Sequence, residues 1–524
     1  MMRFDVYQEG QAPAEVPLST VHMFGQDEIP VRGELKFADG QVQGIRHNDS
    51  AVGLSTLWQT EKAGRTLMQT TRLPVREKPY NLNVEIARAR LLRISQKRED
   101  WGLTDLTLTE EQHELMDQAM ERFIDSLCNL DDPQVAAQYA DQSLDCAFDL
   151  GESLAMGHAK LFLDRRLTTR GLKPHNFGCC LDPTRIADKD YLKILKENFQ
   201  FVTIPVSWKQ IEPKEQEKQF DQLDACISWL RRNRIATKVG PLLSFLPEHL
   251  PDWLFIWEND FEQVREMAYE YVNSVIERYG SKVQAWDVVS GLHANNAFKF
   301  SFEQIVELTR SATMAAKRTS HRSLVLVELT EPWGEYYSRN PRTVPPLIYA
   351  DALYQSGIQF DGFSVQMRFG SPASALRTRD LLEISVMLDK FAAFGKTVHL
   401  TGIQVPSEPA PKGRVGSEPD LSGHWREPWN EEIQAQWLEQ FYQIALSKPY
   451  VETITWQDLA DNESHLHGRG GLLHDNLSPK LAFNAFRRLK EEWLHAKEQA
   501  ESESETTVPT EDEQDDPVAA TDED

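Results

Sequence analysis

The chain has 524 residues and a formal net charge of −25 at pH 7. This length predicts two or three domains, with ample chain to bury a large core. No run approaches the roughly 18 consecutive apolar residues that a membrane-spanning helix needs. The first ten residues also lack the apolar stretch of a signal peptide. We therefore expect a globular protein of the cytoplasm that does not enter a membrane.

The negative charge is concentrated at the C-terminus. Residues 498–524 contain twelve acidic and no basic side chains. Such a segment buries too little apolar surface to offset the entropy of ordering, so we predict a disordered acidic tail over residues 496–524. The tail could engage a protein partner. The rest of the chain is mildly acidic and has no basic stripe to neutralise phosphates, which argues against nucleic-acid binding.

The cysteines show no disulfide pattern. They are odd in number and contain no C-x-x-C pair (Cys128, Cys146, Cys179, Cys180 and Cys226). Buried free thiols in a reducing compartment are the expected state.

The first 168 residues change from a strand period to a helical one. Residues 1–78 contain an Asp39-Gly40 turn between short apolar runs, and the runs 53–61 and 65–73 predict a second hairpin. A small β-sandwich is expected, which either binds carbohydrate or packs against its neighbours. Residues 79–168 predict a helical connector, with a capping box at Thr109 and Gln112 and a third helix that begins at Asp132-Pro133.

Apolar strand-like runs alternate with amphipathic helical patterns between residues 169 and 495. This alternation is the signature of an α/β (β/α)8 TIM barrel, whose functional site lies at the C-terminal ends of the strands. The expected strands are 177–181, 201–206, 237–245, 284–290, 324–330, 360–367, 397–404 and 451–458, and the expected helices are 188–197, 223–233, 261–279, 301–320, 344–356, 376–394 and 430–446.

Short motifs follow one another along these runs. Residues 286–291 read Trp-Asp-Val-Val-Ser-Gly and residues 360–366 read Phe-Asp-Gly-Phe-Ser-Val-Gln. Further motifs are Phe177-Gly178, Trp208 with Ile211-Glu-Pro213, Pro251-Asp-Trp-Leu254 and Ile454-Thr-Trp456. In content and order they resemble glycoside hydrolase family 10, the endo-β-1,4-xylanases. The resemblance implies a TIM barrel that handles xylan-type β-1,4-glycans without a cofactor.

The resemblance also implies where catalytic carboxylates belong. Retaining glycosidases use two of them, about 5–5.5 Å apart. The family carries its acid/base glutamate at the end of the fourth strand and its nucleophile in the seventh. This chain has Gly291 and Gly402 at those places. Glycine can neither donate a proton nor form a glycosyl ester, so we expect a non-catalytic or catalytically altered glycan-binding barrel.

Four residues are candidates for substrate binding. Trp208, Gln366 and Trp456 match sugar-contacting positions of the family, and Arg368 stands where the family has a histidine. A tryptophan in a barrel is also a common core residue, so plain packing is the alternative.

Other carboxylates could have taken over catalysis. Glu328 and Glu331 close the fifth strand at the barrel mouth and are the fallback candidates, although a solvated rim is the simpler interpretation. Asp287 lies inside a strand and is expected to make a structural hydrogen bond. Asp458 and Asp461 follow the eighth strand.

Histidines near the mouth do not predict a metal site. His465, His467 and His474 lie in the loop after the eighth strand and His293 follows the fourth. They have no acidic partners at ligand spacing, so solvated side chains are expected.

Three functional hypotheses remain. The first is a barrel of glycan metabolism that binds an oligosaccharide or polysaccharide without cleaving it. The second is an active O-glycosyl hydrolase with relocated carboxylates. The third is a scaffold in which the barrel, the helical connector and the acidic tail engage a protein.

Overall fold

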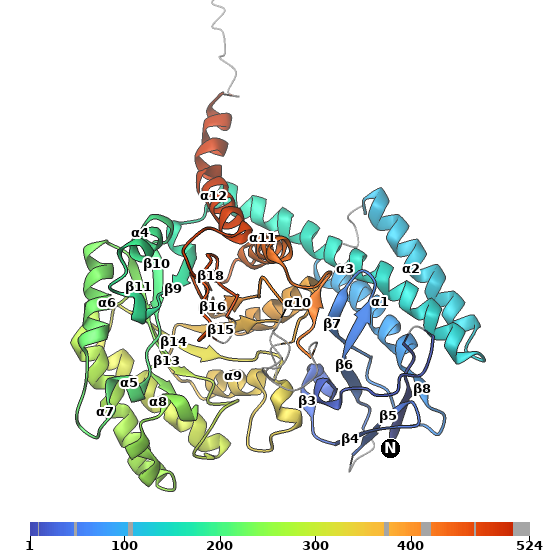
Figure 1. Cartoon of the computed structure of the whole chain (residues 1–524), viewed down its shortest axis with the longest axis horizontal. Coiled ribbons are helices and arrows are strands. Elements are labelled where there is room, and N and C mark those ends of the chain that lie inside the picture. Colours follow the sequence, from blue (N-terminus) through green and yellow to red (C-terminus); the bar gives the residue numbers. More distant parts are fainter. Residues whose placement is uncertain are drawn as a thin grey trace, which may run out of the picture.

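The computed structural model describes residues 1–8, 10–46, 50–102, 108–370, 377–409, 421–465 and 468–506, with side chains as far as residue 496. Figure 1 shows a β-rich N-terminal module in dark blue, a helical segment in lighter blue to teal, and a barrel from green to red. None of the described helices combines the length and the apolarity that crossing a membrane requires.

Eight parallel strands of the described chain close into a barrel. Each strand pairs with the next, and the last pairs with the first, so the ring has no free edge. The short β12 (Leu243–Ser244) continues the third strand beside the fourth. The expected TIM barrel is confirmed. Its strands are β9 (Phe177–Cys180), β10 (Phe201–Ile204), β11 (Ala236–Val239), β13 (Ala285–Ser290), β14 (Leu324–Leu329), β15 (Gly362–Arg368), β16 (Thr397–Gln404) and β18 (Val451–Trp456).

Helices follow the strands and surround the barrel. Asp260, Ser301, Asp380 and Asn430 each cap a helix through a side-chain oxygen that accepts a backbone N–H. The helices are α4 (Lys189–Asn198), α5 (Trp208–Ile211), α6 (Asp221–Arg232), α7 (Phe261–Tyr279), α8 (Phe302–Thr319), α9 (Pro346–Gln355), α10 (Leu381–Ala392), α11 (Glu431–Ser447) and α12 (Leu481–Thr506).

Two predicted elements of the barrel differ from the structure by more than two residues at an end or by a break. The third strand run, expected over residues 237–245, divides into β11 and β12, and Pro241 between them has no N–H to give to a ladder. The helix expected from residue 376 begins at Leu381, because Asp380 caps it. Residues 371–376 lie outside the described chain.

The N-terminal module consists of two sheets that are mainly antiparallel. The first has the order β4-β5-β1-β8 and the second the order β17-β7-β6-β2-β3. Both predicted hairpins are confirmed, and Asp39 and Gly40 have the positive φ values of 54° and 73° that suit a tight hairpin turn. The strands are β1 (Met2–Asp5), β2 (His22–Phe24), β3 (Pro30–Val31), β4 (Glu34–Ala38), β5 (Gln41–Ile45), β6 (Gly53–Thr60), β7 (Gly64–Gln69), β8 (Tyr80–Asn81) and β17 (His424–Trp425).

Three helices form the connector, as predicted: α1 (Leu82–Asp100), α2 (Glu110–Cys128) and α3 (Pro133–Thr169). The capping box at Thr109 and Gln112 is present. Helix α3 has 37 residues and reaches from the N-terminal module to the barrel (Figure 1). Near its end the buried Arg166 donates to the carbonyls of Leu446, Lys448 and Val451 at 2.9–3.0 Å, which satisfies acceptors at the C-terminus of α11. The connector is thereby fixed to the barrel.

The module and the barrel share structure at the barrel mouth. Strand β17 comes from the loop after β16, yet it pairs with β7 of the N-terminal module. In the loop after β14, Arg339 donates to backbone carbonyls of the module, including Val21 at 3.2 Å, and Arg377 in the loop after β15 donates to Ser19 at 2.6 Å. Loops from three neighbouring barrel strands are therefore held by the N-terminal module.

Two expectations about the ends and the thiols need correction. A disordered tail is expected from residue 496, but helix α12 continues to Thr506. The first residues of the predicted tail are Ala, Lys, Glu and Gln, which favour a helix. Residues 507–524 lie outside the described chain. All five cysteines are free, but only three are buried: Cys128 ends α2 and is exposed, and Cys146 is half-buried.

A buried ion pair lies inside the barrel. Lys238 Nζ on β11 lies 2.7 Å from Asp287 Oδ2 on β13, and both side chains are almost inaccessible to solvent. Lys238 also donates to Thr401 Oγ1 on β16 at 3.3 Å, and Ser364 on β15 donates to Asp287. The hydrogen bond expected for Asp287 is confirmed. The network links four barrel strands through their inner faces.

Breaking this pair should destabilise the barrel. Removing one partner of a buried ion pair leaves an uncompensated charge and costs about 3–5 kcal/mol. We expect Lys238→Met to lower the apparent free energy of unfolding in urea by that amount. The control is Lys214→Met, in an exposed pair with Glu217, where the expected loss is about 0–1 kcal/mol. Equal, small losses in both variants would contradict this role of Lys238.

Candidate functional site

A polar pocket opens at the C-terminal ends of the barrel strands. It has a volume of about 240 Å³ and is formed by residues that follow or end β9, β10, β15, β16 and β18. This is the end of a TIM barrel at which functional sites lie. The polar side chains in its lining are Asp182, Arg185, Tyr191, Arg368, Gln404, Gln457, Asp458, Asn462 and His465.

The two glycines at the predicted catalytic positions have left-handed backbone conformations. Gly291 follows β13 with a φ of 61°, and Gly402 lies within β16 with a φ of 59°. Residues with a side chain rarely adopt this conformation. A Cβ atom on Gly291 would lie 3.0 Å from Thr330 Oγ1. Both positions are therefore shaped for glycine.

An arginine lies where a side chain on residue 402 would begin. A Cβ atom there would lie 3.2 Å from both Nε and Nη2 of Arg368, which is the last residue of β15. Arg368 Nη2 donates to Gln457 Oε1 at 3.1 Å, while its Nε is buried without a hydrogen-bond partner in the described part of the chain. The guanidinium thus places a positive charge and an unused donor in the pocket lining.

Two aspartates and a histidine form one side of the pocket. His465 lies between them, with Nδ1 at 3.0 Å from Asp458 Oδ1 and Nε2 at 3.8 Å from Asp182 Oδ2. The Asp458 carboxylate beside it raises the pKa of His465 above its ordinary value. Gln404 Nε2 donates to Asp458 Oδ2 at 2.6 Å, and Gln404 Oε1 is a buried acceptor without a partner within the described residues. The pocket therefore offers both donors and acceptors.

Glu328 lies below this pocket, at the end of β14. Burial raises its pKa to about 7, and the neighbouring Asp287 carboxylate adds to the shift, while Lys238 opposes it. Only 5% of Glu328 is exposed. A carboxyl group with this pKa is neutral in a large fraction of molecules at pH 7, so it can donate a proton or a hydrogen bond.

Glu331 lies in a different environment from Glu328. Its backbone has a φ of 49°, and burial together with the charge of Glu335 raises its pKa to about 8. Burial alone would raise the pKa of Glu335 as well, but Arg379, His22 and Arg377 outweigh it and lower that pKa to about 2. Glu331 thus adjoins the contact between the barrel and the N-terminal module, and it does not line the polar pocket.

The predicted sugar-binding residues lie in different surroundings. Trp208 is 1% exposed, donates from Nε1 to Glu212 at 3.0 Å and stacks on Tyr271. Trp456 is fully buried and donates to the Gly470 carbonyl at 3.0 Å. Gln366 and Arg368 are half-buried, and only Arg368 lines the pocket. Ligand contact by these four residues stays a prediction, and both tryptophans have the packing that the alternative interpretation describes.

The histidines expected to be solvated are mostly engaged. His465 is paired as described above, His293 is fully buried with Nδ1 2.7 Å from the Tyr336 hydroxyl, and His474 lies 3.3 Å from Glu431. His467 lies outside the described residues. Among the described side chains no group of three or more is arranged to hold a metal ion.

Sequence reasoning missed the convergence of Asp182, Gln404, Asp458 and His465. Three of them directly follow or end a predicted strand. Because the C-terminal ends of barrel strands meet at the mouth, the sequence could have indicated that these three residues lie together. His465 belongs to a loop, and nothing in its spacing indicates that the loop folds back toward Asp182.

The stability of the barrel should depend on the ionisation of Glu328. Because its folded pKa lies above the ordinary value of 4.5, its contribution to stability is greatest below pH 4.5 and is lost as the pH rises through about 7. The free energy of unfolding of Glu328→Gln should therefore rise by roughly 1–3 kcal/mol relative to that of wild type as the pH increases from 5 to 8.

Thermal unfolding of both proteins at several pH values measures this difference. Glu266→Gln, at an exposed position on α7, is the matched control and should show a difference that does not change with pH. A constant difference for Glu328→Gln would contradict the raised pKa.

Comparison with known proteins identifies the family. The model of glycosyl hydrolase family 10 matches residues 168–489. Over 316 residues the chain is 22% identical to an endo-1,4-beta-xylanase/feruloyl esterase of Xylanibacter ruminicola. This match covers 55% of this chain but only 42% of that protein. Over 320 residues the chain is 21% identical to endo-1,4-beta-xylanase B of Thermotoga neapolitana. This match covers 58% of this chain and 84% of that protein.

The structure of a family 10 protein from Paenibacillus barcinonensis has a TM-score of 0.49 at 17% identity, and the match covers 61% of this chain and 95% of that one. The family model matches well over half of the chain and includes the whole barrel. The chain therefore belongs to glycosyl hydrolase family 10.

Proposed function

We propose that the barrel binds the end of a xylan-type β-1,4-glycan in the polar pocket and does not hydrolyse it. The observation that carries the proposal is the position of the Arg368 guanidinium, which lies 3.2 Å from the place that a Cβ atom on Gly402 would take. Hydrolysis by this family's chemistry passes through a cationic, oxocarbenium-like transition state that a carboxylate stabilises. A guanidinium beside the predicted nucleophile position disfavours such a state, because like charges repel in a poorly solvated site.

The pocket suits sugar hydroxyl groups. Within the described residues, Arg368 Nε is an unused donor and Gln404 Oε1 an unused acceptor, and Asp182 and Asp458 contribute carboxylate oxygens. A hydroxyl group both donates and accepts, so it can satisfy such a mixed lining. The volume of about 240 Å³ lies below the 300–1,000 Å³ typical of ligand pockets. This size favours a terminal sugar over a longer internal segment.

A relocated hydrolase is the second candidate. It is favoured by Glu328, whose pKa of about 7 suits a general acid. The neighbouring Asp287 carboxylate, which raises the pKa of Glu328, is paired with Lys238 and 1% exposed, which leaves it poorly placed to attack a sugar. If any glycoside is cleaved, Glu328→Gln should abolish the turnover; turnover that survives this substitution would exclude the candidate.

Binding without cleavage can be measured directly. Titration calorimetry with xylobiose and xylohexaose should give heat of binding, while a reducing-end assay detects no new ends. Loss of a charged hydrogen bond costs about 1.5–3 kcal/mol, so Arg368→Met should bind roughly ten- to hundredfold more weakly. Arg232→Met, at an exposed position on α6, is the control and should bind like wild type. Absence of heat across both oligosaccharides, or equal affinity of the two variants, would contradict the proposal.

Restoring a carboxylate at position 402 should not restore activity. Gly402→Glu places a side chain in a left-handed conformation and against Arg368, so it should destabilise the protein by about 1 kcal/mol for the backbone and more for the crowding. Gly357→Glu is the matched control, because Gly357 has a φ of 64° and open space around it. We expect a larger drop in melting temperature for Gly402→Glu and no xylan hydrolysis by either variant. Hydrolysis by Gly402→Glu would show that the site retains the family's chemistry.

A further inference from the structure

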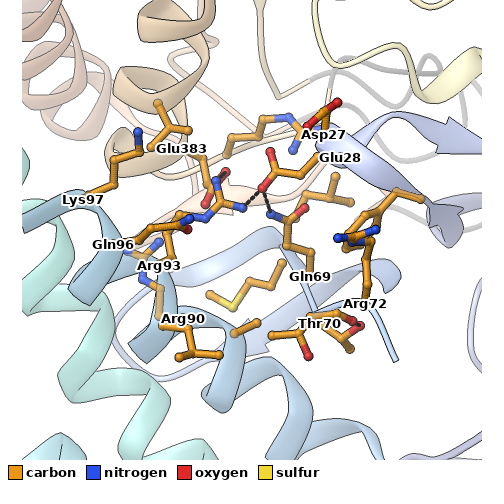
Figure 2. A pocket seen from close by; sticks show the side chains of 18 of the residues that line it. Asp27, Glu28, Gln69, Thr70, Arg72, Arg90, Arg93, Gln96, Lys97 and Glu383 are labelled. Atoms are coloured by element: carbon orange, nitrogen blue, oxygen red, sulfur yellow. Dashed lines mark hydrogen bonds and ion pairs between the residues drawn. The ribbon is translucent and has the colours of Figure 1, made fainter. Parts of the chain in front are cut away.

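A larger cavity lies away from the barrel mouth, between the N-terminal module, the connector and the barrel. It has a volume of about 620 Å³ and is lined by residues of β7, α1 and α10 and by the turn between β2 and β3. Figure 2 shows its polar side chains, which point toward a common space from these separate elements. It shares no lining residue with the polar pocket at the mouth.

A carboxylate of the protein itself occupies a basic cradle in this cavity. Glu28 accepts a hydrogen bond from Gln69 Nε2 at 3.0 Å and from Lys390 Nζ at 2.6 Å, and it pairs with Arg93. Two of these contacts are drawn in Figure 2. Burial opposes ionisation of Glu28, but Arg93 and Lys390 outweigh it and lower the pKa to about 2. The cradle therefore binds an ionised carboxylate strongly.

The backbone that presents Glu28 is strained. Asp27 and Glu28 have φ values of 55° and 62°, and neither is glycine. Consecutive left-handed residues with side chains persist only where the surrounding contacts hold them, and such sites are often functional. If Glu28 left the cradle, this turn could relax to a less strained conformation. The relaxation would offset part of the free energy needed to separate Glu28 from Arg93 and Lys390.

The remaining lining suits a ligand with a charged end and an organic body. The lining also contains Met68, Ile86 and Leu144, all of which are buried. Arg72, labelled at the right of Figure 2, is exposed and makes no hydrogen bond or ion pair with the described residues. Six basic and five acidic side chains line the cavity, whereas the whole chain carries a net charge of −25. The side chains that line the cavity thus carry slightly more positive than negative charge, although the protein as a whole is acidic.

We propose that this cavity binds a small organic carboxylate, which takes the place of Glu28 between Arg93 and Lys390 and covers the apolar wall with its body. Glu28 is then a built-in competitor that keeps the cradle filled when no ligand is present. The volume lies within the range typical of small-molecule sites.

The test is calorimetry on the full chain with cyclohexanecarboxylate and D-glucuronate, which carry the same charged group on an apolar and a hydroxylated body. Glu28→Gln removes the competing charge, and it should bind at least one of the two about tenfold more tightly than wild type. Lys390→Gln removes one donor of the cradle and should bind the same ligand about tenfold more weakly. Lys196→Gln, at an exposed position on α4, should bind like wild type.

The neutral analogues cyclohexylmethanol and methyl β-D-glucoside should not bind. The proposal is overturned if neither carboxylate binds to wild type or to Glu28→Gln, or if Lys390→Gln binds as tightly as wild type. It is also overturned if sulfate binds as tightly as the carboxylates, because the apolar wall then contributes nothing. Circular dichroism verifies that each variant is folded, and the comparison of wild type with Lys390→Gln stands even if Glu28→Gln does not fold.

Discussion

The buried pair of Lys238 and Asp287 sets the electrostatics of the barrel. It places a positive and a negative charge on the inner faces of β11 and β13, and its hydrogen bonds reach Ser364 and Thr401 on the opposite strands. A buried charge without a partner is far more costly than a paired one, so each residue requires the other. The negative charge of Asp287 in turn raises the pKa of Glu328 above it. The charges of Lys238 and Asp287 therefore balance each other inside the barrel.

The fold could be predicted from the sequence because it depends on local patterns. Short buried runs such as residues 285–290 alternate with capped amphipathic helices, and that alternation alone indicates a parallel barrel. The site could be predicted only in part. The left-handed conformation of Gly402 and the position of Arg368 beside it depend on how β15 and β16 are placed side by side, which no single segment specifies. The pairing of His465 with Asp458 depends on the path of a loop.

The three parts of the chain depend on one another more than their sequence boundaries indicate. Strand β17, from a barrel loop, completes a sheet of the N-terminal module, and Arg90 of α1 forms a buried pair with Asp380 at the start of α10. Glu335 of the barrel is enclosed by Arg377 and Arg379, beside His22 of the module. Loops at the barrel mouth thus have a fixed support, and the large cavity lies where these contacts leave space. The loops after β14, β15 and β16 are therefore supported by residues outside the barrel.

One NMR experiment distinguishes a barrel that binds a glycan end and leaves it intact from one that cleaves it or does not bind it. Xylotriose is incubated with the protein, and saturation-transfer difference and anomeric proton spectra are recorded over many hours. We predict saturation transfer that is strongest for a terminal xylose, together with anomeric signals that do not change. New anomeric signals of xylose or xylobiose, or no saturation transfer at all, would contradict this prediction.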